Sequence, residues 1–490
     1  MSDKKVMVAL DCGNSSFRTV VGIYENGRIE TTVVDQIPNA MTQIGEEFYW
    51  DMLLIFREFK NSLRKIAADY NHIDSIGICT WGVDFALFDK EGHMLGNPLS
   101  YRNTIGDAVL GGVPEADRVM LFNETGILCD KINSVYMLSG MKDRFPTILG
   151  AADRCLMVPD ILNYFMTGRM VNEPSELSTT QLMSAKTRQI NPKVCEYFGI
   201  DASLFGEIGV HGTPIGNVRK SILEEIGVDY DIPVICVPSH DTGSAVAAIP
   251  AREKHFGFVS CGTWSLIGTE LEEPIITDDV RESNLTNEVG AFGRITLLKN
   301  NAGMFVVNRL KEEYDRELGR KASWGEVTEL AESCTKVCVI DLNDIAFFNP
   351  VSMKKAVWDY LKKTGQAEGE EADWGVLFMT FYRSLACCYA ATLKDAETVT
   401  GQTFDKIYIV GGGSQSRVLI RETAALVGKP IVVCYGESTS MGNLAVQLKY
   451  HLPDSTLESL RGIIADSYKT EEFLETGCDK TPLDIYRKLV

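Results

Sequence analysis

The chain has 490 residues, of which 45% are hydrophobic and 23% are charged, as in an average globular protein. Its 48 Lys and Arg residues against 67 Asp and Glu residues give a formal net charge of −19 at pH 7. This composition excludes disordered and fibrous classes, and the acidic balance argues against a nucleic-acid partner, which would need clustered Lys and Arg. No uninterrupted apolar run is long enough to predict a membrane span.

The thirteen cysteines include no Cys-x-x-Cys pair, and an odd number cannot pair completely. Reduced thiols are therefore the expected state. The N-terminal segment reaches Asp11 after five apolar residues, which is shorter than the apolar core of a secretory signal. The sequence predicts a cytoplasmic enzyme that needs neither a membrane nor disulfides.

The first hundred residues alternate strand and helix patterns. Two apolar strands, 6–10 and 18–24, flank a turn of small polar residues, and Asn26-Gly27 predicts a second hairpin turn. Residues 52–68 have apolar side chains near helical spacing, and 73–79 is typical of a buried strand. Hairpins followed by helix and strand indicate an α/β layer architecture.

A similar pattern restarts near residue 250. The strand 256–260 and its return at 266–269 flank Cys261-Gly262-x-x-Ser265, which repeats the spacing of Cys12-Gly13-x-x-Ser16. We interpret this as a duplicated fold of two lobes that meet at a central cleft. The expected divisions are an N-terminal lobe at 1–248, a C-terminal lobe at 249–452 and a tail at 453–490.

Three Gly-rich turns follow predicted strands, at Gly13, Gly262 and Gly411. Such turns allow backbone N–H groups to converge on a phosphate, although many are simply turns that exploit the freedom of glycine. Neither a GxxxxGK[ST] loop nor a GxGxxG helix start occurs. A bound nucleotide would therefore use a different motif.

Two further segments lie just past predicted strands, where ligands gather in open α/β sheets. In the first, His240, Asp241 and Thr242 are catalytic candidates, with the alternative that Asp241 or Thr242 caps a helix. In the second, Thr80–Phe85 is a candidate ligand segment, with the alternative that Trp81 and Phe85 belong to the core and that Gly82 is a bulge or a site of close backbone approach.

These motifs, taken in order, resemble those of the FGGY family of carbohydrate kinases. The matching segments are Asp11-x-Gly13-x-Ser15-Ser16, Thr80-Trp81-Gly82-Val83-Asp84, Ser239-His240-Asp241-Thr242, Ser260-Cys261-Gly262-Thr263-Trp264-Ser265 and Val410-Gly411-Gly412-Gly413. Finer matches resemble the rhamnulokinase branch, among them Leu285-Thr286-Asn287-Glu288, Leu298-Lys299-Asn300 and Asn343-Asp344…Phe348-Asn349-Pro350.

The resemblance implies an α/β fold of two actin-like (ribonuclease-H-like) lobes, with ATP and Mg²⁺ as co-substrate and cofactor, and a ketose as substrate. It implies that Asp241 is the catalytic base and that Asp11 holds Mg²⁺, through water. The implied sugar contacts are Trp81, Gly82, Asp84, His240, Asp241, Thr242 and Asn300. The implied ATP contacts are Asn14, Ser15, Ser16, Phe17, Arg18, Gly262, Thr263, Asn308, Gly411 and Gly412.

The expected reaction is phosphorylation of L-rhamnulose, a 6-deoxy ketose, at O1. Phe17 departs from the branch, which usually has glycine there, so L-fuculose or both sugars remain alternative substrates. A non-catalytic actin-like sugar sensor is a rival from another class. It would not need His240 and Asp241, whose presence favours the kinase.

Overall fold

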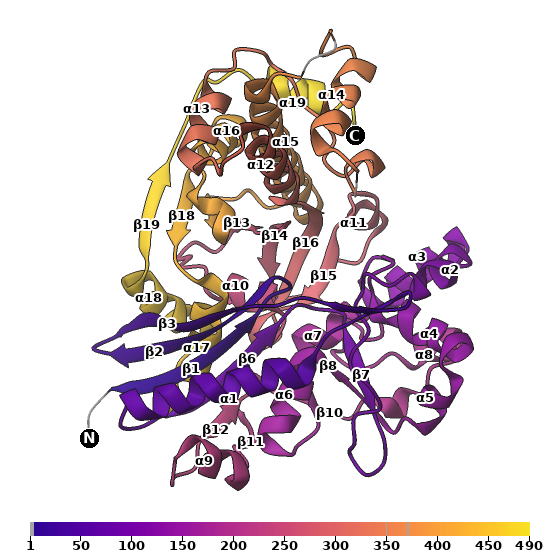
Figure 1. Cartoon of the computed structure of the whole chain (residues 1–490), viewed down its shortest axis with the longest axis vertical. Helices are drawn as coiled ribbons and strands as arrows, with labels where there is room; N and C mark the ends of the chain where they lie inside the picture. The colour runs from indigo at the N-terminus through magenta and orange to yellow at the C-terminus, as the bar shows by residue number, and fades with distance from the viewer. Residues whose placement is uncertain (1–3, 349, 370–371) are drawn as a thin grey trace. The chain divides into compact units, whose positions relative to one another are not determined.

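The computed structural model describes residues 4–348, 350–369 and 372–490, so Asn349 of the predicted motif lies outside the described residues. The chain divides into two compact units (Figure 1). Unit 1 comprises the residues up to Arg252, together with Glu270–Leu297 and Glu437–Tyr468. Unit 2 comprises Glu253–Thr269, Leu298–Gly436 and the residues from Lys469 onward. Unit 1 therefore includes two segments from the second half of the sequence.

Unit 1 contains a six-stranded sheet in the order β11-β12-β6-β1-β2-β3. Strand β1 pairs with β2 in antiparallel and with β6 in parallel orientation, which confirms the predicted first hairpin. The strands are β1 (Lys5–Cys12), β2 (Ser16–Glu25), β3 (Arg28–Pro38), β6 (Ser75–Thr80), β11 (Pro214–Asn217) and β12 (Pro233–Ile235).

Successive side chains of a strand point to opposite faces of the sheet. In β1 the side chains on both faces are apolar, and helices cover both faces. Val8 and Leu10 of β1 pack with helices α1 (Met52–Asp69), α6 (Val158–Thr167) and α9 (Lys220–Ile226). Met7 and Ala9 pack on the other face with α17 (Ser438–His451) and α18 (Leu457–Ser467). The predicted helix at 52–68 is thus confirmed, and the segment after Pro453 contributes α18 to the core of unit 1.

Unit 1 contains further elements outside this six-stranded sheet. They are β4 (Thr42–Ile44), β5 (Glu47–Tyr49), β7 (Phe85–Phe88), α2 (Ile105–Gly111), α3 (Glu115–Thr125), α4 (Ser134–Arg144), α5 (Pro146–Ala151), β8 (Arg154–Met157), β9 (Val171–Asn172), α7 (Pro174–Thr179), α8 (Pro192–Phe198), η1 (Ala202–Leu204), β10 (Glu207–Ile208), α10 (Asp241–Ala247), α11 (Asp278–Glu282), β15 (Thr286–Val289) and η2 (Ala291–Gly293).

A seven-stranded sheet in the order β15-β16-β14-β13-β17-β18-β19 repeats the plan of the first. Its central strand β13 pairs with β14 in antiparallel and with β17 in parallel orientation, as β1 does with β2 and β6. This shared topology confirms the duplicated fold. The strands not yet given are β13 (Phe256–Cys261), β14 (Trp264–Leu271), β16 (Ile295–Ala302), β17 (Lys406–Val410), β18 (Ile431–Tyr435) and β19 (Lys469–Phe473).

The long helix α15 (Trp374–Thr400) lies in the interior of unit 2. It contacts helices α12 (Phe305–Leu318), α13 (Trp324–Glu332), α14 (Met353–Lys363), α16 (Arg417–Val427) and α19 (Thr481–Tyr486). The short turns η3 (Ile345–Phe347) and η4 (Gly412–Gln415) complete the unit.

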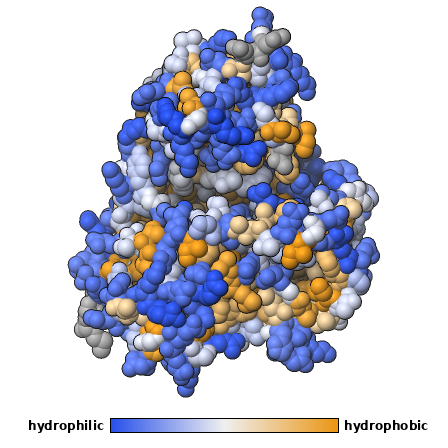
Figure 2. Space-filling model, in the orientation of Figure 1, coloured by the Kyte–Doolittle hydropathy of each residue, from blue (hydrophilic) through white to orange (hydrophobic). Residues whose placement is uncertain are grey.

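By length and composition α15 is apolar enough to cross a membrane, but 89% of its apolar window is buried, as in the core helix of a soluble protein. On the face shown in Figure 2, hydrophilic residues cover most of the surface and apolar residues form separate patches.

Helices α10 and α17 of unit 1 meet at a glycine. A Cβ placed on Gly442 of α17 would lie only 1.8 Å from the backbone oxygen of Ser244 in α10 and 3.2 Å from the nitrogen of Ala248. No side chain fits at this crossing. Because α10 begins at Asp241, this close packing also fixes where that residue lies.

We expect Gly442→Ala to destabilise the protein by about 3 kcal/mol or more, because the backbones of α10 and α17 must separate. The matched control is Gly462→Ala in α18, where no atom lies within 4 Å of the added Cβ and alanine is the better helix former. Thermal unfolding checks both variants. Equal melting temperatures for the two variants would show that the helices do not pack this closely.

Candidate active site

The predicted catalytic segment Ser239–Asp241 runs from the end of β12 into α10. The backbone N–H of Thr80, at the end of β6, donates to the carbonyl oxygen of Ser239 at 2.7 Å. The backbone N–H of His240 donates to the hydroxyl oxygen of Ser175 at 3.0 Å. Two different elements therefore hold the backbone on either side of the peptide bond that joins Ser239 and His240.

Helix α10 does not use Asp241 or Thr242 as its cap. The N-cap residue is His240, whose side chain makes no capping hydrogen bond, and Asp241 is the first helical residue. Among the described residues, the Asp241 carboxylate accepts a side-chain hydrogen bond from the Thr242 hydroxyl at 3.2 Å and no other. The side chain of Asp241 is 37% exposed and so remains accessible to a substrate. The helix-cap alternative therefore does not account for Asp241.

His240 lies between two carboxylates. Its Nδ1 is 3.1 Å from Glu288 Oε2 and its Nε2 is 3.6 Å from Asp241 Oδ1. Burial by itself would lower the pKa of His240, but the charges of Glu288, Asp241 and Glu173 outweigh it and raise that pKa to about 9. The imidazole is therefore protonated at neutral pH. Glu288 belongs to a motif that we quoted for the family resemblance, but sequence reasoning gave it no role.

Gly82 brings the backbone against His240, as expected for a glycine of close approach. A Cβ on Gly82 would lie 3.2 Å from both Cδ2 and Nε2 of the imidazole and 3.1 Å from Cγ2 of Thr179. The next residue, Val83, has a φ of +71°, which is strained for a β-branched residue. Its N–H donates to the Thr179 hydroxyl at 3.0 Å and its carbonyl accepts from the Ser134 hydroxyl at 2.5 Å. These hydrogen bonds hold the strained turn in place.

Trp81 and Asp84 form a buried cluster beside this turn. Asp84 is fully buried, and its Oδ2 accepts hydrogen bonds from the indole nitrogens of Trp50 at 2.6 Å and Trp81 at 2.9 Å. Burial raises the pKa of Asp84 to about 7. Trp81 is only 3% exposed and packs on Trp50 with ring centroids 4.2 Å apart. The side chains of Trp81 and Asp84 are thus buried beneath this turn, and their contact with a sugar stays a prediction.

Asp11 lies at the end of β1, near the catalytic segment. Its carboxylate is 7% exposed, and burial together with the nearby charge of Asp241 raises its pKa to about 7. The Arg18 guanidinium lies 3.8 Å from Asp11 and 2.7 Å from Glu437, and the Ser440 hydroxyl donates to Asp11 at 3.5 Å. Arg18 is therefore a structural ion-pair partner as well as a predicted ATP contact.

The turn between β1 and β2 is closed by backbone hydrogen bonds. The N–H of Gly13 donates to the carbonyl of Ser16 at 3.0 Å, and Asn39 donates through its N–H to Ser15 O and through its side chain to Gly13 O, each at 2.9 Å. The Asn14 amide reaches the Tyr101 hydroxyl at 3.4 Å.

Phe17 follows this turn as a buried residue, paired with Cys12 across the hairpin. A direct contact from Phe17 to a nucleotide would thus come from its backbone.

The donor set of unit 1 is compatible with a magnesium ion, although the described residues contain no group of three or more acidic, His or Cys ligands. Asp11 and Asp241 repel each other, which is the situation that a divalent cation relieves. Magnesium commonly takes one or two carboxylates, with water and substrate phosphates completing its shell. The residues present fit that pattern.

In unit 2 the two remaining Gly-rich turns lie against each other. A Cβ on Gly411, whose φ is +87°, would lie 2.7 Å from the backbone oxygen of Cys261. The turn that follows Cys261 is held by the N–H of Met304, which donates to Gly262 O at 2.9 Å. Near Gly412, by contrast, no atom lies within 4 Å of an added Cβ. Gly411 is thus required by the fold, whereas Gly412 faces open space.

The other predicted residues of unit 2 are exposed. Thr263 lies in the β13–β14 turn, and Asn308 lies in the first turn of α12, whose start at Met304 is bonded to Gly262. Asn300 is an exposed residue of β16, and its neighbour Asn301 accepts from the Asn343 side chain at 3.0 Å. The structure therefore brings Gly262, Gly411 and Asn308 to one region of unit 2.

The sequence matches two family models. The N-terminal domain of the FGGY family of carbohydrate kinases matches residues 6–247, and the C-terminal domain of that family matches residues 257–449. Solved structures share the fold: a gluconate kinase from Lactobacillus acidophilus matches with a TM-score of 0.79 at 14% identity, over 99% of this chain and 96% of that chain. A Plasmodium falciparum glycerol kinase with ADP matches with a TM-score of 0.76 at 14% identity, over 99% and 97% of the two chains.

Relatives of known name are more similar in sequence. A rhamnulokinase from Bacteroides thetaiotaomicron is 35% identical over 450 residues, which are 91% of this chain and 90% of the relative. A rhamnulokinase from Bacillus subtilis is 32% identical over 494 aligned positions, covering 99% and 97% of the two chains. With both family models and these relatives matching along nearly its whole length, the chain belongs to the FGGY family of carbohydrate kinases.

Proposed function

We propose that this protein is a rhamnulokinase, which transfers the γ-phosphoryl group of ATP to O1 of L-rhamnulose in deoxysugar catabolism. The observation that carries the proposal is the accessible carboxylate of Asp241, held next to a protonated His240 and the close backbone approach at Gly82. The names of the curated relatives support the choice of sugar. A ketose and ATP are the partners, and a cytoplasmic location is in keeping with the relatives' class.

Phosphoryl transfer requires alignment and charge neutralisation more than covalent chemistry from the protein. Asp241 is proposed to accept the proton of the sugar O1 hydroxyl as that oxygen attacks the γ-phosphorus. Its carboxylate makes no capping hydrogen bond that would compete for the proton. Gly82 packs against His240, and Thr242 and Asn300 are further proposed sugar contacts.

The protonated imidazole of His240 supplies the positive charge next to this base. Glu288 pairs with Nδ1, and the Nε2–H, which lies 3.6 Å from Asp241 Oδ1, is proposed to donate to a sugar oxygen. Magnesium, when bound near Asp11, would offset the charge of the phosphates. The positive charge of Arg18 partly balances the negative charge of Asp11 at the end of β1.

The turns of both units are proposed to bind the nucleotide. In unit 1 the backbone and hydroxyl groups of residues 14–18 would contact phosphate oxygens. In unit 2 the exposed Thr263 and Gly412 lie on turns, whose backbone N–H groups are proposed to contact the phosphates. Asn308, in the first turn of α12, would contact the nucleotide through its side chain.

The experiment that tests this function is an ADP-release assay with a panel of ketoses. We expect the highest kcat/KM with L-rhamnulose, activity with L-fuculose second, and weaker activity with D-xylulose and glycerol. A methyl-sized difference is worth only about 1–3 kcal/mol, so side activity should be measurable. D-xylulose or glycerol as the preferred substrate would contradict the assignment, and no ADP release with any sugar would favour a non-catalytic sensor.

We expect Glu288→Gln to change the pH dependence of sugar use. In the wild type, Glu288 helps to raise the pKa of His240 to about 9, so the imidazolium persists until the pH approaches that value. Without the carboxylate this pKa falls, and the imidazole loses its proton at lower pH. The kcat/KM for L-rhamnulose should therefore begin to decline at lower pH than in the wild type, with little difference near about pH 6.

The control for this variant is Glu272→Gln, which removes an exposed carboxylate from an ion pair with Arg294. Its pH profile should match the wild type. Superimposable profiles for Glu288→Gln and the wild type would show that Glu288 does not set the charge of His240.

Gly411 and Gly412 should respond differently to substitution. Gly412→Val adds a side chain in open space, so the protein should keep its melting temperature while the KM for ATP rises several-fold and the KM for sugar does not. Gly411→Val meets the backbone of Cys261 in a conformation that favours glycine, so it should lower the melting temperature. An unchanged KM for ATP in Gly412→Val would remove this turn from the proposed nucleotide site.

A further inference from the structure

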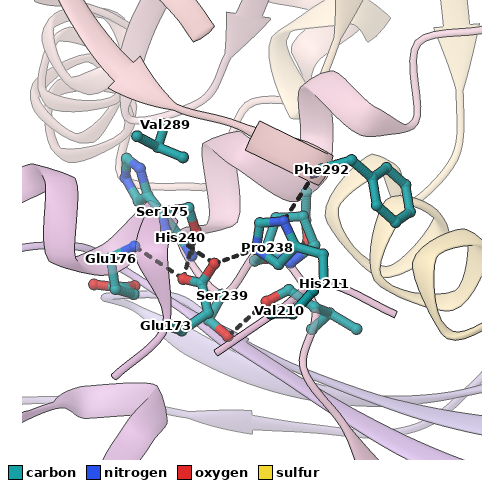
Figure 3. Close-up of polar contacts among 12 residues, drawn as sticks. Glu173, Ser175, Glu176, Val210, His211, Pro238, Ser239, His240, Val289 and Phe292 are labelled. Carbon is teal, nitrogen blue, oxygen red and sulfur yellow. Dashed lines mark hydrogen bonds and ion pairs between the residues drawn. The ribbon is translucent and has the colours of Figure 1, made fainter. Parts of the chain in front are cut away.

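A buried glutamate, Glu173, is linked to the catalytic segment through the hydroxyl group of Ser175. It has no role in the proposed chemistry. Glu173 is 1% exposed, and its carboxylate accepts four hydrogen bonds (Figure 3). Oε1 accepts from His211 Nε2 at 2.5 Å and from the Ser175 N–H at 2.9 Å. Oε2 accepts from the Ser175 hydroxyl at 2.6 Å and from the Glu176 N–H at 2.9 Å. The donors satisfy the buried charge.

The partners of His211 fix its tautomer. The backbone N–H of Phe292 donates to Nδ1 at 2.9 Å, so Nδ1 carries a lone pair and the proton lies on Nε2, which faces Glu173. Phe292 itself has a φ of +53°, a left-handed conformation that is uncommon for a residue other than glycine. Burial alone would raise the pKa of Glu173, but the hydrogen bond from His211 and the other donors lower it overall.

The hydrogen bonds of this cluster run in one direction toward the catalytic segment. Because the Ser175 hydroxyl gives its proton to Glu173, its oxygen presents a lone pair to the N–H of His240, 3.0 Å away. If the Ser175 side chain rotated away from Glu173, its oxygen would move and that N–H would lose its acceptor. Glu173 thus determines the direction of the one hydrogen bond that holds the His240 amide.

Helix capping explains only half of this arrangement. Glu173 is the N-cap residue of α7, and its bonds to the N–H groups of Ser175 and Glu176 are ordinary capping bonds. A cap requires neither the buried imidazole of His211 nor the hydroxyl that links Glu173 to His240. Those two contacts need a different explanation.

We propose that Glu173 is a positioning residue for phosphoryl transfer, which orients the Ser175 hydroxyl so that the amide of His240, and with it the Asp241 carboxylate, is held in place. The inference rests on the proposed function of Asp241 as the base. The hold from Ser175 acts on one side of the Ser239–His240 peptide bond, and the hold from Thr80 acts on the other. Loss of one allows Asp241 to shift, and a displacement of about 1 Å can cost up to about 10²-fold in rate.

Glu173→Gln tests this role. Glutamine keeps the size of the side chain but has one carbonyl oxygen in place of two carboxylate oxygens, so it cannot accept from both the Ser175 hydroxyl and His211 Nε2. We expect kcat with L-rhamnulose to fall between about 10-fold and 10²-fold, while the KM for ATP stays within about two-fold. Turnover is measured per folded protein, below the melting temperature of each variant.

Ser175→Ala tests the link by itself. It removes the acceptor of the His240 N–H but leaves the capping bonds from the backbone of α7 to Glu173, so it remains informative if Glu173→Gln fails to fold. We expect a similar loss of kcat. The double variant should lose no more than the larger single loss, because both changes release the same amide.

The matched control is Glu313→Gln in unit 2. Glu313 is also a buried carboxylate that accepts a serine hydroxyl, from Ser352 at 2.7 Å, and a backbone N–H, from Met353 at 2.6 Å. Its replacement should lower the melting temperature but leave kcat per folded protein unchanged. This separates positioning from a general effect of removing a buried charge.

Asp241→Asn, assayed alongside, separates the two levels of the argument. If it loses turnover while Glu173→Gln and Ser175→Ala keep wild-type kcat, the positioning role is wrong and the proposed base stands. If Asp241→Asn keeps turnover, both are wrong. A fall in kcat for Glu173→Gln that multiplies fully with that of Ser175→Ala would also overturn the proposal, since the two would then act independently.

Discussion

Two hydrogen bonds on either side of the peptide bond between Ser239 and His240 determine what this site can do. The donor from Thr80 belongs to the central sheet of unit 1, and the acceptor on Ser175 belongs to α7. The close crossing at Gly442 fixes the axis of the helix that follows. The sheet, through Thr80, helix α7, through Ser175, and helix α17, through Gly442, therefore all hold the backbone at the start of α10. Asp241 takes its position from these three contacts and does not cap the helix.

Charge gives the site its second constraint. Asp241, Glu173 and Glu288 together raise the pKa of His240, whereas the pKa of Asp11 is raised first by burial and then by the charge of Asp241. The protonated imidazole of His240 and the Arg18 guanidinium oppose this negative charge directly, and a divalent cation would add to them. The candidate site is acidic, as is the whole protein with its net charge of −19. In the proposed function, its acidic groups would hold a metal ion and accept a proton.

Much of the fold and part of the site could be predicted from sequence because the signals were local. Hairpins, the helix at 52–68 and the repeated Cys-Gly-x-x-Ser turn follow from strand periodicity and glycine spacing. The link between Glu173, His211 and Phe292 could not be predicted, since it joins residues up to 119 positions apart. Strand β19, with the polar sequence Lys-Thr-Glu-Glu-Phe, carried no apolar signal for its place at the edge of a sheet. Likewise, Trp81 and Asp84 were predicted to contact the sugar. In the structure both side chains are buried and hydrogen-bonded in a cluster with Trp50, which the sequence pattern did not indicate.

The central claim is that Asp241 accepts the proton of the sugar hydroxyl from a position that the fold sets in advance. The most direct measurement is the turnover of Asp241→Asn together with its melting temperature and its affinity for L-rhamnulose. The account predicts an unchanged melting temperature, retained sugar binding and a kcat lower by about 10²-fold to 10⁴-fold, the usual contribution of a positioned general base. A folded variant that phosphorylates L-rhamnulose at close to the wild-type rate would contradict it.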